Sequence, residues 1–399
     1  MEFGPIVRAL TRNKVRVLLI VLQIAITLAV ITNAINMIAA ERVKMQKQSG
    51  FDDENLLWVR SRPFAEAFNE RSFRITTTQS DVRALAAIPG VRGAANTSFL
   101  PWQGGGSSGE VKAGGGDGTL YRMQMYTSSP GITDTLGVRM VSGRNLRDSD
   151  IDLDPNATTS AIIISRELEK LVFKGQSAVG RQLIERDNSV DNIVGVFDPF
   201  YNPYGWPIHE YTYFAAGVVS RGGANFLVRV EPGKMKQVIP MIEKRLLVVN
   251  DGRNFDLKTV SEIKDRYFTE SRIVIGAMTA VIVLLIIVTG LGIVGVTSFS
   301  VTERRKQIGT RRALGATKQA ILRHFLLENW IITNSGVILG LALAYGLNYV
   351  LVTNTGGVKL DWRFVAGGVV LLWAQGIFAT LAPATRAAAV SPVVATRSI

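Results

Sequence analysis

Residues 273–302 read IVIGAMTAVIVLLIIVTGLGIVGVTSFSVT, a run of 30 residues without a charged side chain. A helix needs about 20 apolar residues to cross the roughly 30 Å hydrocarbon core of a bilayer. Further charge-free windows lie at residues 17–40, 329–358 and 364–385. The sequence therefore predicts an α-helical membrane protein with four transmembrane helices. We place these spans at residues 17–40, 272–302, 325–353 and 364–385.

The first window shares one feature with a secretory signal peptide, because four basic residues precede it. A signal peptide has an apolar core of roughly 7–15 residues, followed by small residues at a cleavage site. The window at 17–40 is longer, and no convincing cleavage site precedes Glu41. We therefore expect an uncleaved helix that follows a cytoplasmic arm at residues 1–16.

Lysine and arginine are concentrated at three short segments, residues 1–16, 301–324 and 384–399, which hold 13 basic and two acidic residues. Residues 41–272 hold 30 basic and 28 acidic residues. Short basic segments resist translocation and stay in the cytoplasm. Both termini are therefore expected in the cytoplasm. The expected order between the spans is an extracytoplasmic domain at 41–271, a cytoplasmic loop at 303–324, a short outer loop at 354–363 and a cytoplasmic tail at 386–399.

This charge distribution also explains the formal net charge of +13, so we expect no nucleic-acid partner. The basic residues flank the spans, where they meet anionic lipid of the bilayer. The chain contains no cysteine, which excludes disulfides and thiolate sites. Its two histidines, His209 and His324, fall on opposite sides of the membrane in this topology, so no histidine pair for a zinc site is expected.

Two glycine-containing segments match catalytic motifs only weakly. Residues 105–109 fit the G-x-S-x-G pattern of hydrolases, but they lie in a glycine-rich run at 104–118, which we expect to be a mobile loop. Residues 175–182 have the glycine spacing of a phosphate loop, but Arg181 and Gln182 stand where Lys and Ser/Thr are required, so we expect a helix-to-strand turn. We predict a non-catalytic chain without a catalytic or metal site and without a cofactor of its own.

The extracytoplasmic domain is expected to be a mixed α/β domain inserted between the first and second spans. Short apolar runs predict strands at residues 56–59, 161–164, 193–197 and 226–230. Helical patterns lie at residues 81–88 and 234–249. Ser261 is the expected cap of a further helix that leads into the second span.

The segment TERRKQIGTRRALGATKQAILRHFLLENW, residues 302–330, connects the second and third spans. Gly315 suits the end of a short basic helix, and Thr317 suits the N-cap of the next helix. Such a helix would present Ile308 and Leu314 together with Arg311 and Arg312, and could dock into a cleft on a cytoplasmic partner. The alternative is an interfacial helix that lipid headgroups hold at the membrane surface.

At these residues the chain resembles the MacB/FtsX permease family, whose members carry a similar E-R-x-x-E-I-G-x-R-x-A-L-G-A-T segment after the second span. Gln307 departs from the acidic residue of that pattern, which puts one charge contact in doubt. The resemblance implies that the segment is a coupling helix seated on the ATP-binding subunit. The residues that this assigns to coupling are Glu303, Arg304, Ile308, Gly309, Arg311, Arg312, Leu314, Gly315 and Ala316.

The resemblance extends over nearly the whole chain. Residues 136–144, 162–183 and 193–196 look like parts of a MacB-like periplasmic core domain, and residues 383–397 look like the end of an FtsX-like permease domain. The resemblance implies a periplasmic module in two parts, one of them inserted into the other, and we place the insertion at about residues 99–223. The macrolide exporter of the family carries a fused ATP-binding domain, which this chain lacks, so we expect a separate ATP-binding subunit that uses ATP and Mg²⁺.

The resemblance implies an ABC transporter permease of the mechanotransmission type, in which force rather than substrate passes through the membrane helices. Efflux of a drug, peptide or other small molecule from the periplasm or inner membrane is the expected function. A lipoprotein-releasing permease, and an FtsX-like regulator that transmits force to a periplasmic partner, are the alternatives. The expected partners are an ABC ATP-binding subunit, a second identical or related permease, the lipid bilayer, a periplasmic adaptor and an outer-membrane channel. The expected location is the bacterial inner (plasma) membrane.

Polar side chains within the spans could mark a pathway or form hydrogen bonds between helices. They are Gln23, Asn33, Asn36, Asn334, Asn348 and Gln375. None is ionisable, so we predict that they form hydrogen bonds between helices or face the membrane interface. Gly336 and Gly340 form a small-x-x-x-small pair, which favours close helix packing.

Overall fold

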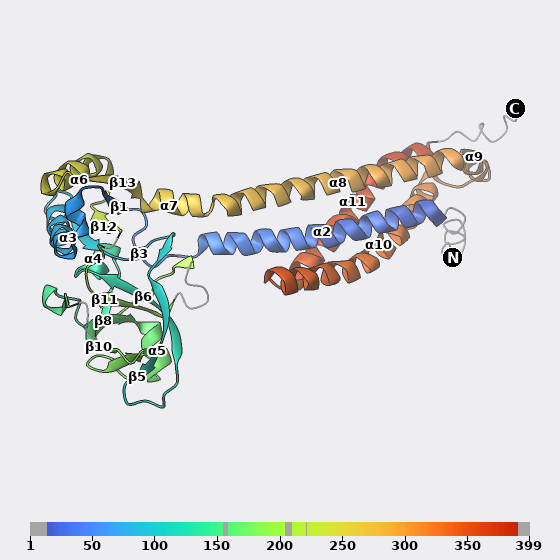
Figure 1. Cartoon of the computed structure of the whole chain (residues 1–399). Helices are drawn as coiled ribbons and strands as arrows, with labels where there is room; N and C mark the ends of the chain where they lie inside the picture. Colours follow the sequence, from blue (N-terminus) through green and yellow to red (C-terminus); the bar gives the residue numbers. More distant parts are fainter. Residues whose placement is uncertain (1–13, 155–158, 204–209, 221, 390–399) are drawn as a thin grey trace. The chain divides into compact units, whose positions relative to one another are not determined.

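The computed structural model describes residues 14–154, 159–203, 210–220 and 222–389. The chain forms two units (Figure 1). The membrane unit consists of two segments, the residues up to Gln46 and those from Glu270 onward, and the extramembrane domain is Lys47–Thr269. The predicted arm up to residue 13, the tail from residue 390, and His209 lie outside the described residues.

Within the described residues, four helices of the membrane unit are long and apolar enough to cross a bilayer. They are α2 (Lys14–Gln46), α8 (Thr269–Glu303), α10 (Lys318–Thr355) and α11 (Trp362–Ala388). The short helix α9 (Arg305–Ala313) lies between α8 and α10 in the chain. Each predicted span falls within one of the four long helices, and the mixed α/β domain lies between the first and second of them. The predicted fold class is therefore confirmed.

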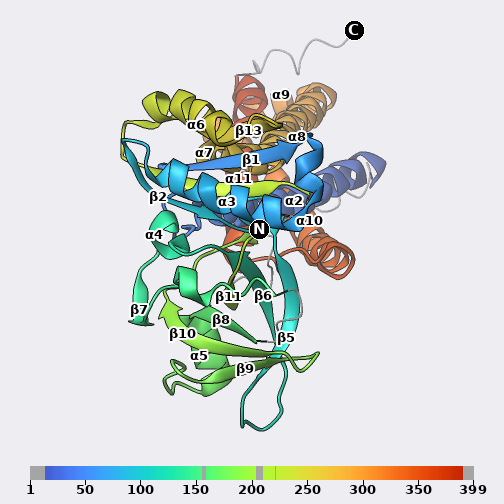
Figure 2. The same cartoon turned by 60° about the vertical axis from the view of Figure 1, so that its left-hand side comes forward.

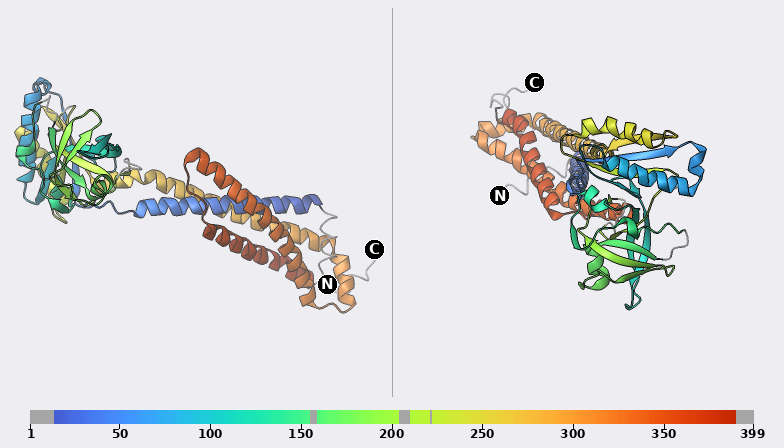
Figure 3. Two further views of the ribbon diagram at one scale, coloured as in Figure 1. Left: turned by 90° about the horizontal axis from the view of Figure 1, so that it is seen from below. Right: turned by 90° about the vertical axis from the view of Figure 1, so that its left-hand side faces the viewer.

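Helices α2, α10 and α11 pack against one another in the membrane unit (Figure 3). A Cβ atom built on Gly336 of α10 would lie 2.7 Å from Cβ of Ile24, and one built on Gly340 would lie 3.0 Å from the carbonyl oxygen of Ala25. Side chains at these positions would push the two helices apart, since such distances are shorter than van der Waals contact. The close packing predicted for this glycine pair is thus present at the α2–α10 contact.

Three buried asparagines, two on α2 and one on α10, connect α2 with α10 and with the loop between α10 and α11. The Asn33 side chain donates to the carbonyl oxygen of Ala344 at 3.0 Å, and the Asn348 side chain donates to Oδ1 of Asn33 at 3.1 Å. Asn36 and Asn348 both donate to the carbonyl oxygen of Val358, each at 3.2 Å. A hydrogen-bonded carbonyl is far less costly to bury than an unpaired one, so these contacts stabilise the loop against α2.

The other polar side chains in the spans also form hydrogen bonds. Gln23 donates to the carbonyl oxygen of Val288 on α8 at 3.0 Å, and Gln375 of α11 donates to that of Ile286. Asn334 donates to the carbonyl oxygen of Trp330 in its own helix at 2.7 Å. Hydrogen bonds between helices are therefore confirmed for Gln23, Asn33, Asn348 and Gln375. Asn36 bonds to the loop between α10 and α11, and Asn334 bonds within its own helix.

The first part of the extramembrane domain is a four-stranded antiparallel sheet with two helices on one face (Figure 2). Its elements are β1 (Leu56–Pro63), α3 (Arg71–Ala86), β2 (Val91–Asn96), β12 (Ala224–Val230), α6 (Met235–Val249) and β13 (Arg253–Thr259). The strand order β13-β1-β12-β2 is that of two interleaved β-α-β units. The sheet core includes Leu57, Phe226 and Val228, all fully buried, packed against Leu85 of α3 and Ile242 of α6.

The second part lies in the chain between β2 and β12 and forms a closed ring of strands. Its elements are β5 (Ser107–Ala113), β6 (Tyr121–Ser128), β7 (Met140–Gly143), β8 (Thr159–Ser165), α5 (Arg166–Phe173), β9 (Gln182–Glu185), β10 (Val190–Phe197) and β11 (Thr212–Ala216). The sheet order is β7-β10-β8-β11-β6-β5-β9, and the ring closes because β9 also pairs with β10. Leu168, Val172 and Phe173 of α5 pack into the core of this ring.

The domain also contains short elements within and between these parts. They are η1 (Glu66–Asn69), β3 (Phe99–Leu100), β4 (Gly104–Gly105), α4 (Ile132–Leu136), η2 (Asp148–Asp150) and α7 (Val260–Tyr267). The expected N-cap at Ser261 is wrong, because Thr259 caps α7 and forms a capping box with Glu262. Thr259 lies two residues before Ser261. Its side chain accepts from the amide of Glu262, and the Glu262 carboxylate accepts from the amide of Thr259.

The other secondary-structure predictions for this domain are mostly confirmed. The four predicted strands fall within β1, β8, β10 and β12, and the two predicted helices overlap α3 and α6. The expected mobile loop at 104–118 is wrong over its first ten residues, which form β4, Gly106 and β5. Glycine is needed there for close packing, since a Cβ on Gly106 would overlap the Tyr126 ring and one on Gly109 would overlap Met125 Sδ. Residues 175–181 form the expected turn between α5 and β9.

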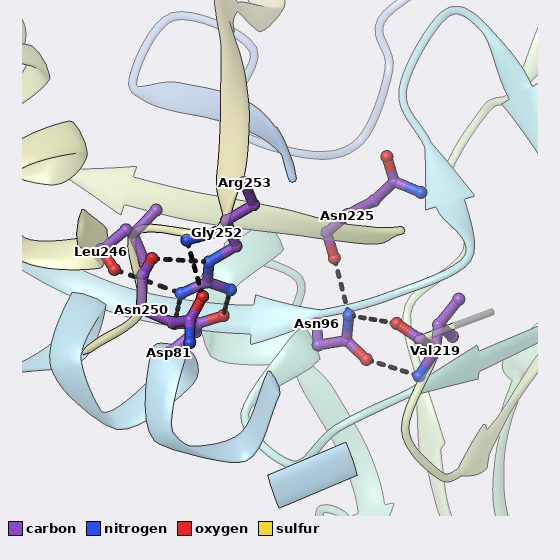
Figure 4. A network of polar contacts seen from close by, with 8 residues as sticks. All are labelled: Asp81, Asn96, Val219, Asn225, Leu246, Asn250, Gly252 and Arg253. Carbon is purple, nitrogen blue, oxygen red and sulfur yellow. Dashed lines mark hydrogen bonds and ion pairs between the residues drawn. The ribbon is translucent and has the colours of Figure 1, made fainter. Parts of the chain in front are cut away.

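Two polar groups hold the first part together (Figure 4). The guanidinium of Arg253, at the start of β13, forms a two-pronged ion pair with Asp81 of α3, and both side chains are at most 1% exposed. Arg253 also donates to the carbonyl oxygens of Leu246 and Asn250. The second group is Asn96, whose side chain bonds to both backbone groups of Val219 and to the carbonyl oxygen of Asn225, where the chain returns from the ring to β12.

Replacing Arg253 by Met should lower the free energy of unfolding of the domain by about 3–5 kcal/mol, because the Asp81 carboxylate would stay buried without a partner. Thermal unfolding of the full chain in detergent measures this. Arg62→Met is the matched control, since its ion pair with Asp256 is exposed and should contribute at most about 1 kcal/mol. Equal losses in the two variants would contradict the prediction.

A second buried acidic group lies in the ring of strands. Asp191 of β10 is 4% exposed, and its Oδ2 atom has no hydrogen-bond partner. Nearby, the Tyr213 hydroxyl donates to Oε1 of Glu185 at 2.5 Å. Burial, and next the negative charge of Glu185, raise the pKa of Asp191 to about 7. The folded chain therefore keeps a proton on this carboxyl that the unfolded chain releases near pH 4.

Because the pKa of Asp191 is higher in the folded state, its contribution to stability is complete at low pH and is lost as pH rises through about 7. Between pH 5 and pH 8, the free energy of unfolding should fall by about 2 kcal/mol from this group. Asp191→Asn should remove this part of the pH dependence. Unfolding temperatures measured at both pH values check the prediction, and the same pH dependence in the variant would show that other groups cause it.

Candidate docking helix

Helix α9 is a nine-residue helix whose two ends are fixed by its own sequence. At its C-terminus Gly315 adopts φ +96°, a conformation that glycine adopts without strain. The amide of Ala316 donates to the carbonyl oxygen of Arg311 at 3.0 Å, and the amide of Gly315 to that of Arg312 at 3.2 Å, which is a Schellman motif. Thr317 then caps α10 by accepting from the amide of Ala320 at 3.2 Å. The predicted roles of Gly315 and Thr317 are confirmed.

One face of α9 is buried against the neighbouring helices. Ile308 is 5% exposed and packs with Ile321 and Phe325 of α10 and with Ala384 and Ala387 of α11. Gly309 is buried beside it. The sequence led us to expect Ile308 on the exposed face with Leu314, and that expectation is wrong. The apolar side chain anchors the helix instead, because alanines on α11 leave room for it.

An ion pair fixes the start of this segment to α10. The two terminal guanidinium nitrogens of Arg304 donate to the Glu328 carboxylate, at 3.0 and 3.3 Å, and the two side chains are 19% and 8% exposed. Paired nitrogens and oxygens of this kind define the orientation as well as the distance of the two groups. Arg304, which the sequence assigns to coupling, therefore points into the membrane unit.

Glu303 lies at the surface beside α2. Its carboxylate is 3.6 Å from the Arg16 guanidinium, with side-chain exposures of 50% and 33%. Arg16 also lies over the ring of Phe299, 3.9 Å from its centre. An exposed pair of this kind contributes at most about 1 kcal/mol, so Glu303 remains accessible to a partner.

The opposite face of α9 is exposed and basic. Leu314 is 84% exposed at the end of the helix, with Arg311 exposed one turn before it. Arg312 is half-buried and donates to the carbonyl oxygen of Ala316 at 3.2 Å, which closes the turn, and Ala316 packs beside the core around Ile308. The exposed surface of α9, named here the docking face, consists of Arg305, Lys306, Gln307, Thr310, Arg311, Ala313, Leu314 and Gly315.

Gln307, which stands in place of an acidic residue, lies at the edge of the docking face. With Arg311 and His324 it lines a hollow of about 100 Å³ above Ile308 and Phe325. A neutral side chain there leaves the cationic character of the face undiminished.

The structure also identifies functional residues that were not predicted from the sequence. Glu328, Ile321, Phe325 and the alanines of α11 position α9, although none lies in the motif. Glu328 had a detectable signal, since it is an acidic residue directly before a charge-free window of 30 residues. A carboxylate at such a depth needs a cation, and the nearest basic segment contains Arg304.

Comparison with known proteins places these features in a family. Residues 17–244 match the family model of the MacB-like periplasmic core domain, and residues 279–392 match that of the FtsX-like permease C-terminal domain. The chain is 25% identical over 333 residues to the ABC transporter permease YknZ of Bacillus subtilis (strain 168), covering 81% of this chain and 79% of that protein.

The chain is also 25% identical over 399 residues to the macrolide export ATP-binding/permease protein MacB of Azoarcus sp. (strain BH72), covering 98% of this chain and 58% of that protein. Among solved structures, the periplasmic region of MacB from Actinobacillus actinomycetemcomitans aligns with 57% of this chain and 98% of its own, at 14% identity and a TM-score of 0.38.

Replacing Arg304 by Met should destabilise the membrane unit by about 3 kcal/mol, since Glu328 would remain buried without its cation. The double variant Arg304→Met with Glu328→Gln should recover much of the loss, which a double-mutant cycle of thermal unfolding in detergent measures. Arg305→Met is the control, because Arg305 is exposed on the docking face. A loss in the Arg305 variant as large as that of Arg304→Met would contradict a specific role for the ion pair.

Proposed function

The chain belongs to the family of ABC transporter permeases with a MacB-like periplasmic core domain and an FtsX-like permease domain, and we propose that it is the permease subunit of a mechanotransmission-type transporter. The observation that carries this proposal is the docking face of α9. It combines an apolar knob, Leu314, with the cations of Arg305, Lys306 and Arg311 on a rigidly anchored helix. The complementary surface is an apolar cleft with an acidic rim.

The partner that fits this surface is an ABC ATP-binding subunit, which would bind ATP and Mg²⁺. Movement of that subunit would displace α9. Because Ile308 and the Arg304–Glu328 ion pair connect α9 to α10 and α11, the displacement would be passed to the long helices rather than absorbed by a loose loop. Force would thus reach the membrane unit without a substrate path between its helices. The hydrogen-bonded polar residues of the spans support this, since they serve packing.

A complete transport unit would contain two permeases and two ATP-binding subunits. The second permease would pack beside α8, where Ile273, Leu284 and Leu291 are 60–66% exposed and face either lipid or another helix. We propose the bacterial inner membrane as the location, with both termini in the cytoplasm and the extramembrane domain in the periplasm. The proposed cargo is a drug, peptide or other small molecule, with a periplasmic adaptor and an outer-membrane channel as further partners.

Leu314→Asp should abolish capture of the ATP-binding subunit when the full chain is purified from its native host in mild detergent. A carboxylate among the cations, in place of the apolar knob, should weaken binding at least about tenfold, the loss typical of a central interface residue. Val248→Asp is the matched control, because Val248 is 75% exposed on α6 of the extramembrane domain. Both changes are at exposed positions and should leave the unfolding temperature nearly unchanged.

Identification of the co-purifying proteins then separates the functional classes. An ATP-binding subunit recovered with wild type and Val248→Asp, but not with Leu314→Asp, supports the proposal. An additional adaptor indicates efflux, retention of lipoproteins in the membrane after gene deletion indicates lipoprotein release, and a cell-wall hydrolase indicates a regulator. If no ATP-binding subunit is recovered from wild type even after cross-linking, the proposal fails.

A further inference from the structure

A groove of about 600 Å³ runs between α10 and α11 on the surface of the membrane unit. Its volume lies within the range of small-molecule sites, about 300–1,000 Å³. Its walls are almost entirely apolar and include two tryptophans, Trp330 at 50% and Trp373 at 40% exposure. The side chains that line this α10–α11 groove are Gln319, Leu322, Arg323, Leu326, Leu327, Asn329, Trp330, Thr333, Trp373 and Ile377.

At the floor of the groove, Gly376 of α11 packs closely against α10. A Cβ atom built on Gly376 of α11 would lie 2.9 Å from Nδ2 of Asn329 and 3.1 Å from Oγ1 of Thr333. Thr333 is 2% exposed, and its hydroxyl has no hydrogen-bond partner in the protein. A buried hydroxyl without a hydrogen-bond partner is costly, and this one belongs to a residue in the wall of the groove.

One end of the groove is basic. Arg323 is exposed, and no carboxylate within the described part of the chain forms an ion pair with it. Gln319 lies one turn before it on α10 and lines the same end. Ten residues separate Arg323 from Thr333, which corresponds to roughly 15 Å along the helix axis. The groove therefore has a cation and an amide at one end and a long apolar channel beyond them.

We propose that the α10–α11 groove binds one anionic phospholipid, with its phosphate against Arg323 and Gln319 and one acyl chain along Leu326, Trp373 and Ile377. Three features of the groove match this ligand. Its length and apolar walls suit a hydrocarbon chain, its cation suits a phosphate, and its position on two membrane helices exposes it to lipid. Arg323 and Trp330 lie in the N-terminal part of α10, and arginine and tryptophan are the residue types that mark the boundary between hydrocarbon and headgroups.

The site is independent of the docking face. Arg323 and the tryptophans lie on α10 and α11, outside α9, so lipid would bind whether or not an ATP-binding subunit is present. An acyl chain held in the groove would add contacts to both α10 and α11 beside the place where the two helices pack against each other. The bound lipid would then stabilise one spacing of these two helices.

The test uses the full chain reconstituted in vesicles of equal parts phosphatidylglycerol and phosphatidylcholine, released gently and weighed by native mass spectrometry. The wild-type chain should retain more phosphatidylglycerol than phosphatidylcholine. Arg323→Gln should reduce that preference about five-fold, the effect of one cation near an anionic headgroup. Arg386→Gln is the matched control, because Arg386 is exposed in the last turn of α11 but does not line the groove. Ile377→Trp, which fills the channel, should also reduce retention.

Three outcomes would overturn the proposal. One is equal retention of the two lipids by wild type, and another is an equal effect of Arg386→Gln, which would mean diffuse surface attraction. The third is occupation of the groove by a second copy of the chain. Because the chain has no cysteine, Trp373→Cys introduces a single thiol, and a disulfide between two copies under mild oxidation would show that occupation. Labelling of this thiol by a membrane-soluble reagent, with protection by phosphatidylglycerol, would support the lipid site.

Discussion

The contact between α2 and α10 at Gly336 and Gly340 is the constraint on which the arrangement of the membrane unit depends. Hydrocarbon solvates apolar side chains as well as protein does, so helices in a membrane associate through close packing and hydrogen bonds. The glycines allow that packing along the middle of the two helices. The asparagines near Val358 hold the loop after α10 against α2, and the Arg304–Glu328 pair holds the start of α9 against α10. Without these contacts the polar groups would be left unpaired.

The fold class could be predicted because length and charge alone determine whether a segment can cross a bilayer. Strands and helices of the extramembrane domain were predicted where apolar residues recur with a clear period, as in β12 and α6. The glycine-rich run at 104–118 was not, because its glycines permit contact with Tyr126 and Met125, residues that a different strand supplies. Local composition cannot distinguish a glycine that makes the backbone flexible from a glycine that is needed for close packing of a side chain from another strand.

The candidate site shows the same limit. The motif located the helix, its terminating Gly315 and the cap at Thr317, since these depend on residues within a few positions of one another. The motif alone could not show which of its residues are buried and which are exposed. Ile308 is buried because Phe325 and the small residues of α11 receive it, and Arg304 turns inward because Glu328 lies 24 residues further along the chain. Both causes are contacts between distant segments.

The ring of strands in the extramembrane domain begins and ends at neighbouring points of one sheet. Asn96, the last residue of β2, is paired with Phe226 of β12, and the Asn96 side chain bonds to the returning segment at Val219. A segment whose two ends are adjacent can be exchanged for another without lengthening the path of the surrounding chain, since only a short connection must be closed. The ring of strands between β2 and β12 can therefore be replaced as one continuous segment, which would change the outer surface of the domain while the four-stranded sheet is kept.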